Sequence, residues 1–307
     1  VLYSVGGARL FFSNCHIKNN HAEDGGVLYL SGTHISQLAF FHNLSFSNNT
    51  ANKAAGSIYI FKMNVVVVLN IQVNHSVAKY KGGGLFYVEA SVKVLLKNIS
   101  ASYLYSRFLS GGFILANKLD LFITVKCQVQ NTFASLDGAV GKISQVRIAY
   151  IINTTVMGSY CKNKGCAFHM KSIPNATVVS SNFANIYSKS SGGIYFSSVY
   201  RVTITYCKFY NNTSEISAGS LFITNVYLIN LLSSHFLYNK AITGDGGAAV
   251  IKSSVVIMTI SNVFNFNSGK EFGGSFLISG SYRKCFVSIY NDTYESHSIE
   301  NSGAAIY

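Results

Sequence analysis

Acidic side chains are scarce in this 307-residue sequence, which holds 11 Asp and Glu residues against 24 Lys and Arg. Paired carboxylates serve as acid and base in glycoside hydrolysis, and clustered carboxylates bind Ca²⁺. Only Asp245, Glu271 and Glu300 recur at similar places in consecutive segments, two or three residues before a glycine. Such a column could bind a cation weakly. The plainer interpretation is three solvated carboxylates in turns.

Other groups that could do chemistry do not form a motif. The 8 His residues are scattered, and His21 near Asp24 is interpreted as a surface turn pair rather than a catalytic dyad. The phosphate-binding GxxxxGK[ST] loop is absent, as are the HExxH, GxSxG and CxxC motifs. We therefore predict no catalytic residue, no metal ligand, no cofactor and no enzymatic activity.

Six cysteines allow one local pairing. Cys161 and Cys166 lie five residues apart on either side of a turn at Gly165, which makes them a candidate disulfide. The alternative is that all six cysteines are small, buried apolar residues.

Asn-x-Ser/Thr sequons begin at nine Asn residues, whereas composition alone predicts about 5. Asn48 and Asn211 are each followed by a second Asn. Neighbours in an extended segment point to opposite faces, so Asn48 and Asn211 face solvent if Asn49 and Asn212 stack inward. We expect N-linked glycans on Asn48 and Asn211, and an unmodified Asn212 despite its own sequon. The other candidate glycosylation sites are Asn43, Asn74, Asn98, Asn153, Asn175 and Asn291.

A repeat carries all these residues. A Gly-containing pair precedes a short apolar run, as in GGVLYL from Gly25, AGSIYI from Ala55 and SGGIYF from Ser191. Its second residue marks each copy, at Gly7, Gly26, Gly56, Gly83, Gly112, Gly138, Gly165, Gly192, Gly219, Gly247, Gly274 and Gly303. From Gly26 onward the marks are 26 to 30 residues apart. A Phe-x-x-Asn motif precedes several marks, in FSNN, FYNN, FLYN and FNFN.

The period and composition of the repeat indicate strands. The segments are rich in Val, Ile, Tyr, Phe and Thr, with period-2 stretches such as Leu119, Leu121, Ile123 and Val125. The leucine-rich repeat signature is missing. We predict an all-β, parallel β-solenoid whose coils of about 27 residues stack at roughly 4.8 Å.

With these FxxN and GGxxY-like motifs, the whole chain resembles right-handed parallel β-helix proteins of the pectin-lyase-like class. Within that class it is similar to the FxxN/GGA[IL] repeats of polymorphic outer-membrane proteins and of large eukaryotic surface proteins. The class contains both pectin-degrading enzymes and noncatalytic surface proteins. The resemblance therefore implies a right-handed β-helix and leaves the function open.

Composition and chain ends suggest the setting of the protein. We expect residues 1–307 to form one β-helix domain, a fragment continuing beyond both ends, without a transmembrane segment because apolar runs are short. The sequons favour an extracellular or cell-surface location. The net charge of +13 could attract anionic polysaccharide, whereas no nucleic-acid-reading motif accompanies the scattered Lys.

The strand after each mark is apolar on both faces. We expect the second residue after the mark to point inward and the third to point outward, because Tyr hydroxyls there could reach water. The predicted outward stripe comprises Tyr29, Tyr59, Phe86, Leu115, Phe168, Tyr195, Phe222, Val250 and Leu277. Such a stripe calls for a cover. Another β-helix copy or a neighbouring domain is the expected one, while turns folding back over the stripe and a sugar-stacking face are the alternatives.

These observations favour a noncatalytic structural module, a rigid glycosylated rod that packs laterally or end to end in a filament or surface layer. The alternative is a carbohydrate-binding or carbohydrate-cleaving β-helix. An adhesion protein would share the rod and carry recognition in its loops.

Overall fold

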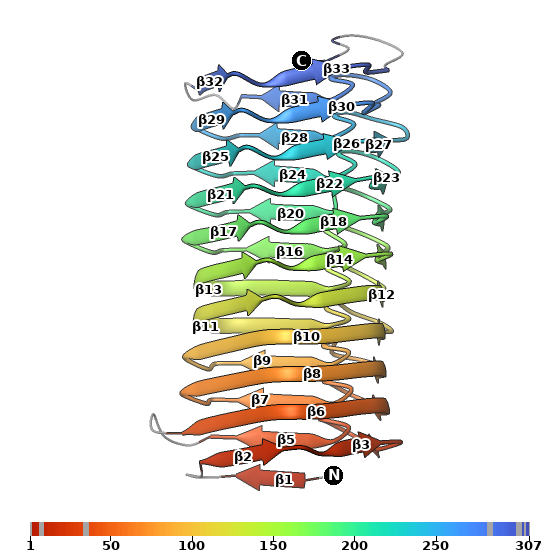
Figure 1. Cartoon of the computed structure of the whole chain (residues 1–307), viewed down its shortest axis with the longest axis vertical. Helices are drawn as coiled ribbons and strands as arrows, with labels where there is room; N and C mark the ends of the chain where they lie inside the picture. Colours follow the sequence, from red (N-terminus) through yellow and green to blue (C-terminus); the bar gives the residue numbers. More distant parts are fainter. Residues whose placement is uncertain are drawn as a thin grey trace.

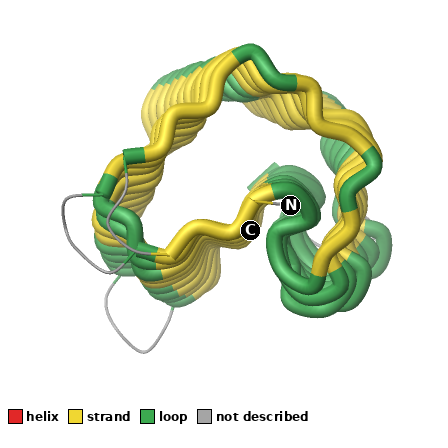
Figure 2. The backbone as a smooth tube through the Cα atoms, turned by 90° about the horizontal axis from the view of Figure 1, so that it is seen from below, coloured by secondary structure: helices red, strands yellow, loops and turns green. Residues whose placement is uncertain are grey.

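The chain folds into a single right-handed coil of parallel strands, seen from the side in Figure 1 and along its axis in Figure 2. This computed structural model describes residues 2–5, 9–32, 37–280, 285–298, 303 and 305–306. Every described strand pairs in parallel with its equivalents in the adjacent coils, and no described residue is helical. The predicted all-β parallel solenoid is confirmed. Gly7 and Glu300 lie outside the described residues.

Four sheets run along the axis, and sheet 1 contains the strands that follow the glycine marks. Its strands are β1 (Leu2–Val5), β5 (Leu28–Ser31), β7 (Ile58–Phe61), β9 (Phe86–Glu89), the starts of β11 (Ile114–Val125) and β13 (Gly141–Ile152), β16 (Phe168–Lys171), β20 (Ile194–Ser197), β24 (Leu221–Thr224), β28 (Ala249–Lys252) and β31 (Phe276–Ser279).

Sheet 2 follows sheet 1 around a corner that contains one left-handed residue, such as Lys62 (φ 56°) or Ser172 (φ 56°). Its strands are β2 (Leu10–Ser13), the first parts of β6 (Leu38–Ala51), β8 (Val65–Ala78) and β10 (Lys93–Ser106), the second halves of β11 and β13, β17 (Asn175–Val179), β21 (Arg201–Thr205), β25 (Leu228–Leu232), β29 (Val256–Ile260) and β32 (Phe286–Tyr290).

Sheets 3 and 4 complete each coil. Sheet 3 holds β3 (His16–Lys18), the middle parts of β6, β8 and β10, the start of β12 (Gln128–Ala134), β14 (Thr155–Met157), β18 (Asn182–Ala184), β22 (Lys208–Tyr210), β26 (His235–Leu237), β30 (Val263–Asn265) and β33 (Thr293–Glu295). Sheet 4 holds β4 (His21–Ala22), the ends of β6, β8, β10 and β12, β15 (Tyr160–Cys161), β19 (Tyr187–Ser188), β23 (Thr213–Ser214) and β27 (Lys240–Ala241).

Single residues in the left-handed conformation make the corners between sheets. Asn43 (φ 52°) turns β6 from sheet 2 to sheet 3, and Asn48 (φ 53°) turns it from sheet 3 to sheet 4. Asn tolerates this conformation better than most residues with a Cβ. These corners thus explain part of the high Asn content of the repeat.

The FxxN motif builds the interior. Phe209, Phe236 and Phe264 are buried and stacked, with centroids 4.6 Å apart for Phe209–Phe236 and 4.8 Å for Phe236–Phe264. The motif's Asn forms a second buried row, in which Asn239 Nδ2 donates to Asn267 Oδ1 at 3.0 Å. Each buried amide also satisfies backbone groups of adjacent coils, which keeps the coils in register.

Candidate functional site

The outer face of sheet 1 carries the predicted stripe, and the structure corrects its membership. Tyr29, Tyr59, Leu115 and Phe222 point outward and are half-buried. Phe86 and Phe168 are wrong, because both are fully buried in the interior. The outward residues of their strands are Tyr87 and His169, which pair in register with Tyr59 and Tyr195.

The position of the glycine mark within the turn explains the two errors. Gly83 (φ 70°) and Gly165 (φ 58°) stand at the left-handed turn position, which Ala55 (φ 55°) occupies one residue before the mark Gly56. Phe86 pairs with Ile58 and Phe168 pairs with Ile194, so both stand at the inward position. Ile58 and Ile194 lie two residues after their glycine marks, whereas Phe86 and Phe168 lie three residues after theirs. A one-residue shift moves a side chain to the opposite face of a strand.

Turns cover much of the stripe. Tyr195, Val250 and Leu277 point outward but are buried, with exposed fractions of 7%, 0% and 5%. Gly246 has φ +62°, and a Cβ on it would lie 2.3 Å from Val250 Cγ2. Leu277 packs with Phe272 of the preceding turn. The alternative in which turns fold back over the stripe therefore holds in its C-terminal half, at Tyr195, Val250 and Leu277.

Stacking among the half-buried Tyr rings limits what the N-terminal half of the stripe can bind. The Tyr29 and Tyr59 rings stack 4.7 Å apart, and the Tyr59 and Tyr87 rings stack 4.9 Å apart. Both pairs are within 5° of parallel. Burial raises the pKa of Tyr59 to about 12, so its hydroxyl stays protonated at neutral pH. Since the ring faces cover each other, sugars are offered ring edges and hydroxyls rather than a stacking platform.

A charged centre interrupts the stripe at mid-length. Asp137, in the turn before β13, is 7% exposed, and its Oδ2 lies 3.2 Å from Lys142 Nζ. Asn163 Nδ2 donates to its Oδ1 at 2.8 Å. His169 Nδ1 lies 3.2 Å from Oδ2 without the alignment of a hydrogen bond.

The electrostatics of this centre favour a carboxylate anion. Burial by itself raises the pKa of Asp137, but His169 and Lys142 outweigh burial and hold that pKa far below its usual range. The centre thus holds an ionised carboxylate that pins the turn to sheet 1. Both ring nitrogens of His169 are buried, so neither reaches a ligand on the outer surface in this structure.

Sequence reasoning missed His169, Lys142 and Asp137 as a group. These residues come from two adjacent coils, and Lys142 precedes His169 by one repeat, with the two side by side in register. The available signal was Asp137 itself, because this acidic residue stands directly before Gly138, the glycine mark that departs from the repeat pattern.

The outer face of sheet 2 was also missed. Its outward positions on β11 and β13 are Leu121, Ile123, Val125, Ile148, Tyr150 and Ile152, all half-buried. Alternating apolar residues at Leu121, Ile123 and Val125 indicated a strand with a buried face. In the structure these three side chains point outward, while Phe122 faces the core.

Cysteines occupy three environments: a disulfide, two buried thiols, and two half-buried thiols at Cys15 and Cys285. The Cys161 and Cys166 sulfurs form a disulfide, with Cα atoms 5.1 Å apart. Cys127 and Cys207 are free thiols whose pKa burial raises to about 11. Such thiols are unreactive at neutral pH.

Most sequon asparagines stand on corners. Left-handed φ values occur at Asn43, Asn48, Asn98, Asn153, Asn211 and Asn291. Asn48 and Asn211 are exposed, while Asn49 and Asn212 are fully buried, as predicted for their orientation. Asn74 and Asn175 lie within strands. Glycosylation itself stays a prediction at all of these sites.

The predicted acidic column does not assemble into a cation site in the described part of the chain. Asp245 Oδ2 lies 3.9 Å from Lys252 Nζ. Among the described residues, no group of three or more His, Cys, Asp or Glu could hold a metal ion. Asp24 accepts a hydrogen bond from the Ala54 backbone at 3.1 Å, as expected of a turn carboxylate.

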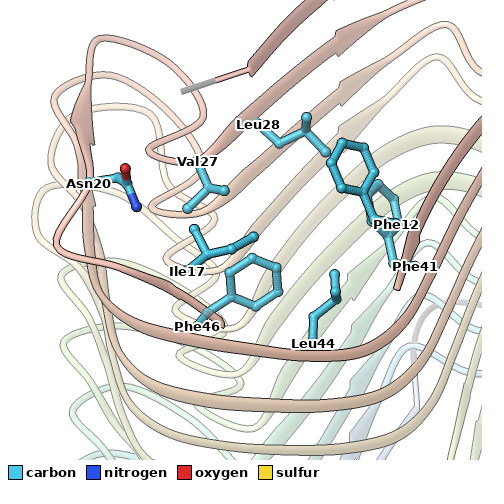
Figure 3. Close-up of a pocket in the computed structure, with 8 residues that line it drawn as sticks. All are labelled: Phe12, Ile17, Asn20, Val27, Leu28, Phe41, Leu44 and Phe46. Atoms are coloured by element: carbon cyan, nitrogen blue, oxygen red, sulfur yellow. The ribbon is translucent and has the colours of Figure 1, made fainter. Parts of the chain in front are cut away.

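A cavity of about 300 Å³ lies at the N-terminal end of the interior (Figure 3). Its lining is Phe12, Ile17, Asn20, Val27, Leu28, Phe41, Leu44 and Phe46. The amide of Asn20, the one polar side chain among them, donates to Asn49 Oδ1 and to the Lys18 carbonyl. This cavity is a continuation of the core and offers no acid, base or nucleophile.

Comparison with known proteins supports the fold. No protein-family model matches the chain, and no curated protein matches its sequence. Among solved structures, the A-module of the mannuronan C-5 epimerase AlgE6 from Azotobacter vinelandii is similar, with a TM-score of 0.50 and 8% identity. The match covers 95% of this chain and 88% of that one. None of the described residues forms a helix able to cross a membrane.

This similarity corrects one prediction. We expected the chain not to be an enzyme, but the similar β-helix is a module of an enzyme. At 8% identity the likeness shows the shared β-helix fold and identifies no catalytic residue in this chain.

Proposed function

We propose that this chain is a rigid rod module of an extracellular surface or filament protein, and that it assembles sideways through the outer face of sheet 2. The observation that carries the proposal is the apolar character of that face, where β-branched and aromatic side chains point away from the core. Monomeric proteins seldom leave apolar faces of this extent open.

The interior supports the rod. Rows of stacked Phe and hydrogen-bonded Asn hold consecutive coils at fixed spacing, so bending the rod would break several contacts at once. The resemblance to repeats of polymorphic outer-membrane proteins and eukaryotic surface proteins, together with the corner sequons, supports the extracellular setting. Glycans on the corners would leave the flat sheets available for packing.

Electron microscopy of the native surface material tests this proposal. We expect rods that touch along their sides, with sheet 2 at the contact. Rods that are isolated in the native material, with sheet 2 facing solvent, would contradict it.

The similar solved structure favours a second function, because that protein is named as an epimerase of mannuronan. We propose as the alternative that this chain binds or modifies an acidic polysaccharide, which its net charge of +13 would attract. Lys164 Nζ, 5.0 Å above the Tyr195 ring, and the partly exposed Lys142 place cations beside the sheet 1 stripe.

Incubation with mannuronan tests the alternative. Proton NMR would detect a change at the sugar ring, and co-sedimentation at low and high salt would detect charge-driven binding. Neutral dextran is the matched control. An unchanged polymer that does not bind even at low salt would exclude this alternative.

A further inference from the structure

Sheet 2 presents three outward columns, which we name the edge-1, central and edge-2 columns. Edge-1 contains Leu38, Val65, Lys93, Leu121, Ile148, Asn175, Arg201, Leu228, Val256 and Phe286. The central column contains Phe11, Phe40, Val67, Leu95, Ile123, Tyr150, Thr177, Thr203, Asn230, Met258 and Ser288. Edge-2 contains Ser13, His42, Leu69, Lys97, Val125, Ile152, Val179, Thr205, Leu232, Ile260 and Tyr290.

Sheet 3, on the same coils, provides an internal comparison. Most of its outward positions are polar, for example Gln72, Ser100, Gln128, Thr155 and Asn182, whereas Met157, Leu237 and Val263 are outward and apolar. A strand exposed to water normally alternates apolar inward and polar outward residues, and sheet 3 follows this rule. Sheet 2 departs from it, because its outward face is mostly apolar as well as its inward face. Parallel sheets with two apolar faces are usually covered on both sides.

Charge on the three columns is confined to their edges. Lys93 and Arg201 belong to edge-1 and Lys97 to edge-2, and all three are exposed. None of the columns contains Asp or Glu. Long basic side chains at an edge can keep their charge in water while their stems pack. An uncharged centre with a charged rim is the usual composition of a protein–protein interface.

The area of this outward face suits packing against a second copy of the chain. Eleven strands at about 4.8 Å spacing and five residues at about 3.3 Å each give a flat face of roughly 800 Å². A stable protein–protein interface of standard size buries about 800 Å² on each partner. A flat sheet face of short Val, Ile, Leu and Thr side chains also suits the face-to-face packing of two sheets about 10 Å apart.

We infer that sheet 2 packs face to face against sheet 2 of a second copy of this chain. This inference rests on the proposed assembly function and adds the identity of the partner.

Pairing through sheet 2 requires that Asn175 carry no glycan. Asn175 stands in the edge-1 column with the sequon Asn-Ala-Thr, so a glycan attached there would rise from the proposed interface. Glycosylation of Asn175 and pairing through sheet 2 therefore exclude each other. The corner asparagines Asn98 and Asn153 border the face without lying in it.

Sedimentation velocity on the whole chain tests the pairing with matched variants. The double variant Ile123→Lys/Tyr150→Lys puts two charges into the central column. Gln128→Lys/Thr155→Lys puts the same two charges on sheet 3 of the same coils. We expect dimers of the unchanged chain and of the sheet 3 variant, and at least a 100-fold weaker association of the sheet 2 variant. Circular dichroism confirms that all three proteins fold. An unchanged chain that stays monomeric, or two variants that associate equally, would overturn the inference.

Photo-crosslinking separates this inference from the assembly function. A benzoylphenylalanine at Thr177 should crosslink to sheet 2 of another copy, and the dimer fraction should lack a glycan on Asn175. Crosslinks to a different polypeptide in the native material would overturn the second copy while leaving sideways assembly intact. A different result would be that the unchanged chain captures anionic lipid vesicles through sheet 2 and loses this capture in the Ile123→Lys/Tyr150→Lys variant. That result would overturn both the second copy as partner and the sideways assembly. So would native rods that form no protein crosslink from Thr177.

Discussion

Asp137 shows at the scale of one residue how a turn is held against a strand. Its carboxylate contacts Lys142 of the same coil and His169 of the next, and it accepts a hydrogen bond from Asn163. A carboxyl group whose pKa is lower in the folded than in the unfolded state stabilises the fold at pH values above the unfolded pKa. The stabilisation is then lost as the pH falls.

Asp137→Asn should therefore remove an acid-sensitive contribution to stability. We expect the free energy of unfolding at pH 7 to fall by about 1–3 kcal/mol, since charged hydrogen-bond partners are lost. The difference between the variant and the unchanged chain should begin to narrow below the unfolded pKa of about 3.9 and should close only as the pH approaches the much lower folded pKa. Urea unfolding from pH 7 down to about pH 2 measures this difference. A gap that stays constant over that range would show that the charge of Asp137 is irrelevant.

Asn48 and Asn211 carry a prediction about modification. Both are exposed at left-handed corners, whereas Asn212 is buried and its Nδ2 donates to the Phe183 carbonyl at 2.9 Å. If the chain is secreted, intact-glycopeptide mass spectrometry should find glycans on Asn48 and Asn211 and none on Asn212. Glycosylated Asn212 would show that the modification precedes folding of that coil.

The Asn row is the stabilising element of the coils. Asn239 is fully buried: its Oδ1 accepts from the Asn212 backbone at 3.1 Å, and its Nδ2 donates to the Phe209 carbonyl at 3.0 Å. Removing the amide leaves a buried donor and a buried acceptor without partners. Each such group costs about 1–3 kcal/mol.

Asn239→Ala should thus lower the free energy of unfolding by about 2–4 kcal/mol in denaturant titrations. Asn182→Ala is the matched control, because Asn182 points outward on sheet 3 and is half-exposed. The control should change stability by less than about 0.5 kcal/mol. Equal effects of the two substitutions would mean that the row is not a stabilising element.

At the scale of the whole molecule, a solenoid has no contacts between distant coils, and each coil is supported only by its neighbours. Local opening should therefore be easiest at the ends of the stack. Hydrogen exchange followed by mass spectrometry should find the slowest amides in β13, β17 and β21 and faster ones in β3 and β33. Uniform rates along the axis would indicate that all coils unfold together.

The periodic features of this protein were predictable from its sequence. The glycine marks predicted the coil length, the β-rich composition predicted parallel strands, and Asn48 and Asn49 were assigned to opposite faces. These inferences succeed because each coil repeats the same local pattern. Coil length, strand content and the alternation of neighbouring side chains can therefore be inferred from single repeats.

Only the tertiary structure decided which faces meet. Gly83 and Gly165 stand one residue earlier in their turns than Gly56 does in its own, so Phe86 and Phe168 point inward and Tyr87 and His169 outward although the motifs look alike. The contact between Asp137 and His169, and the two apolar faces of sheet 2, likewise depend on the register between coils. Alternation along a strand separates its two faces, but the left-handed residue of the preceding turn decides which face meets the core, and its position is known only once the coils are stacked.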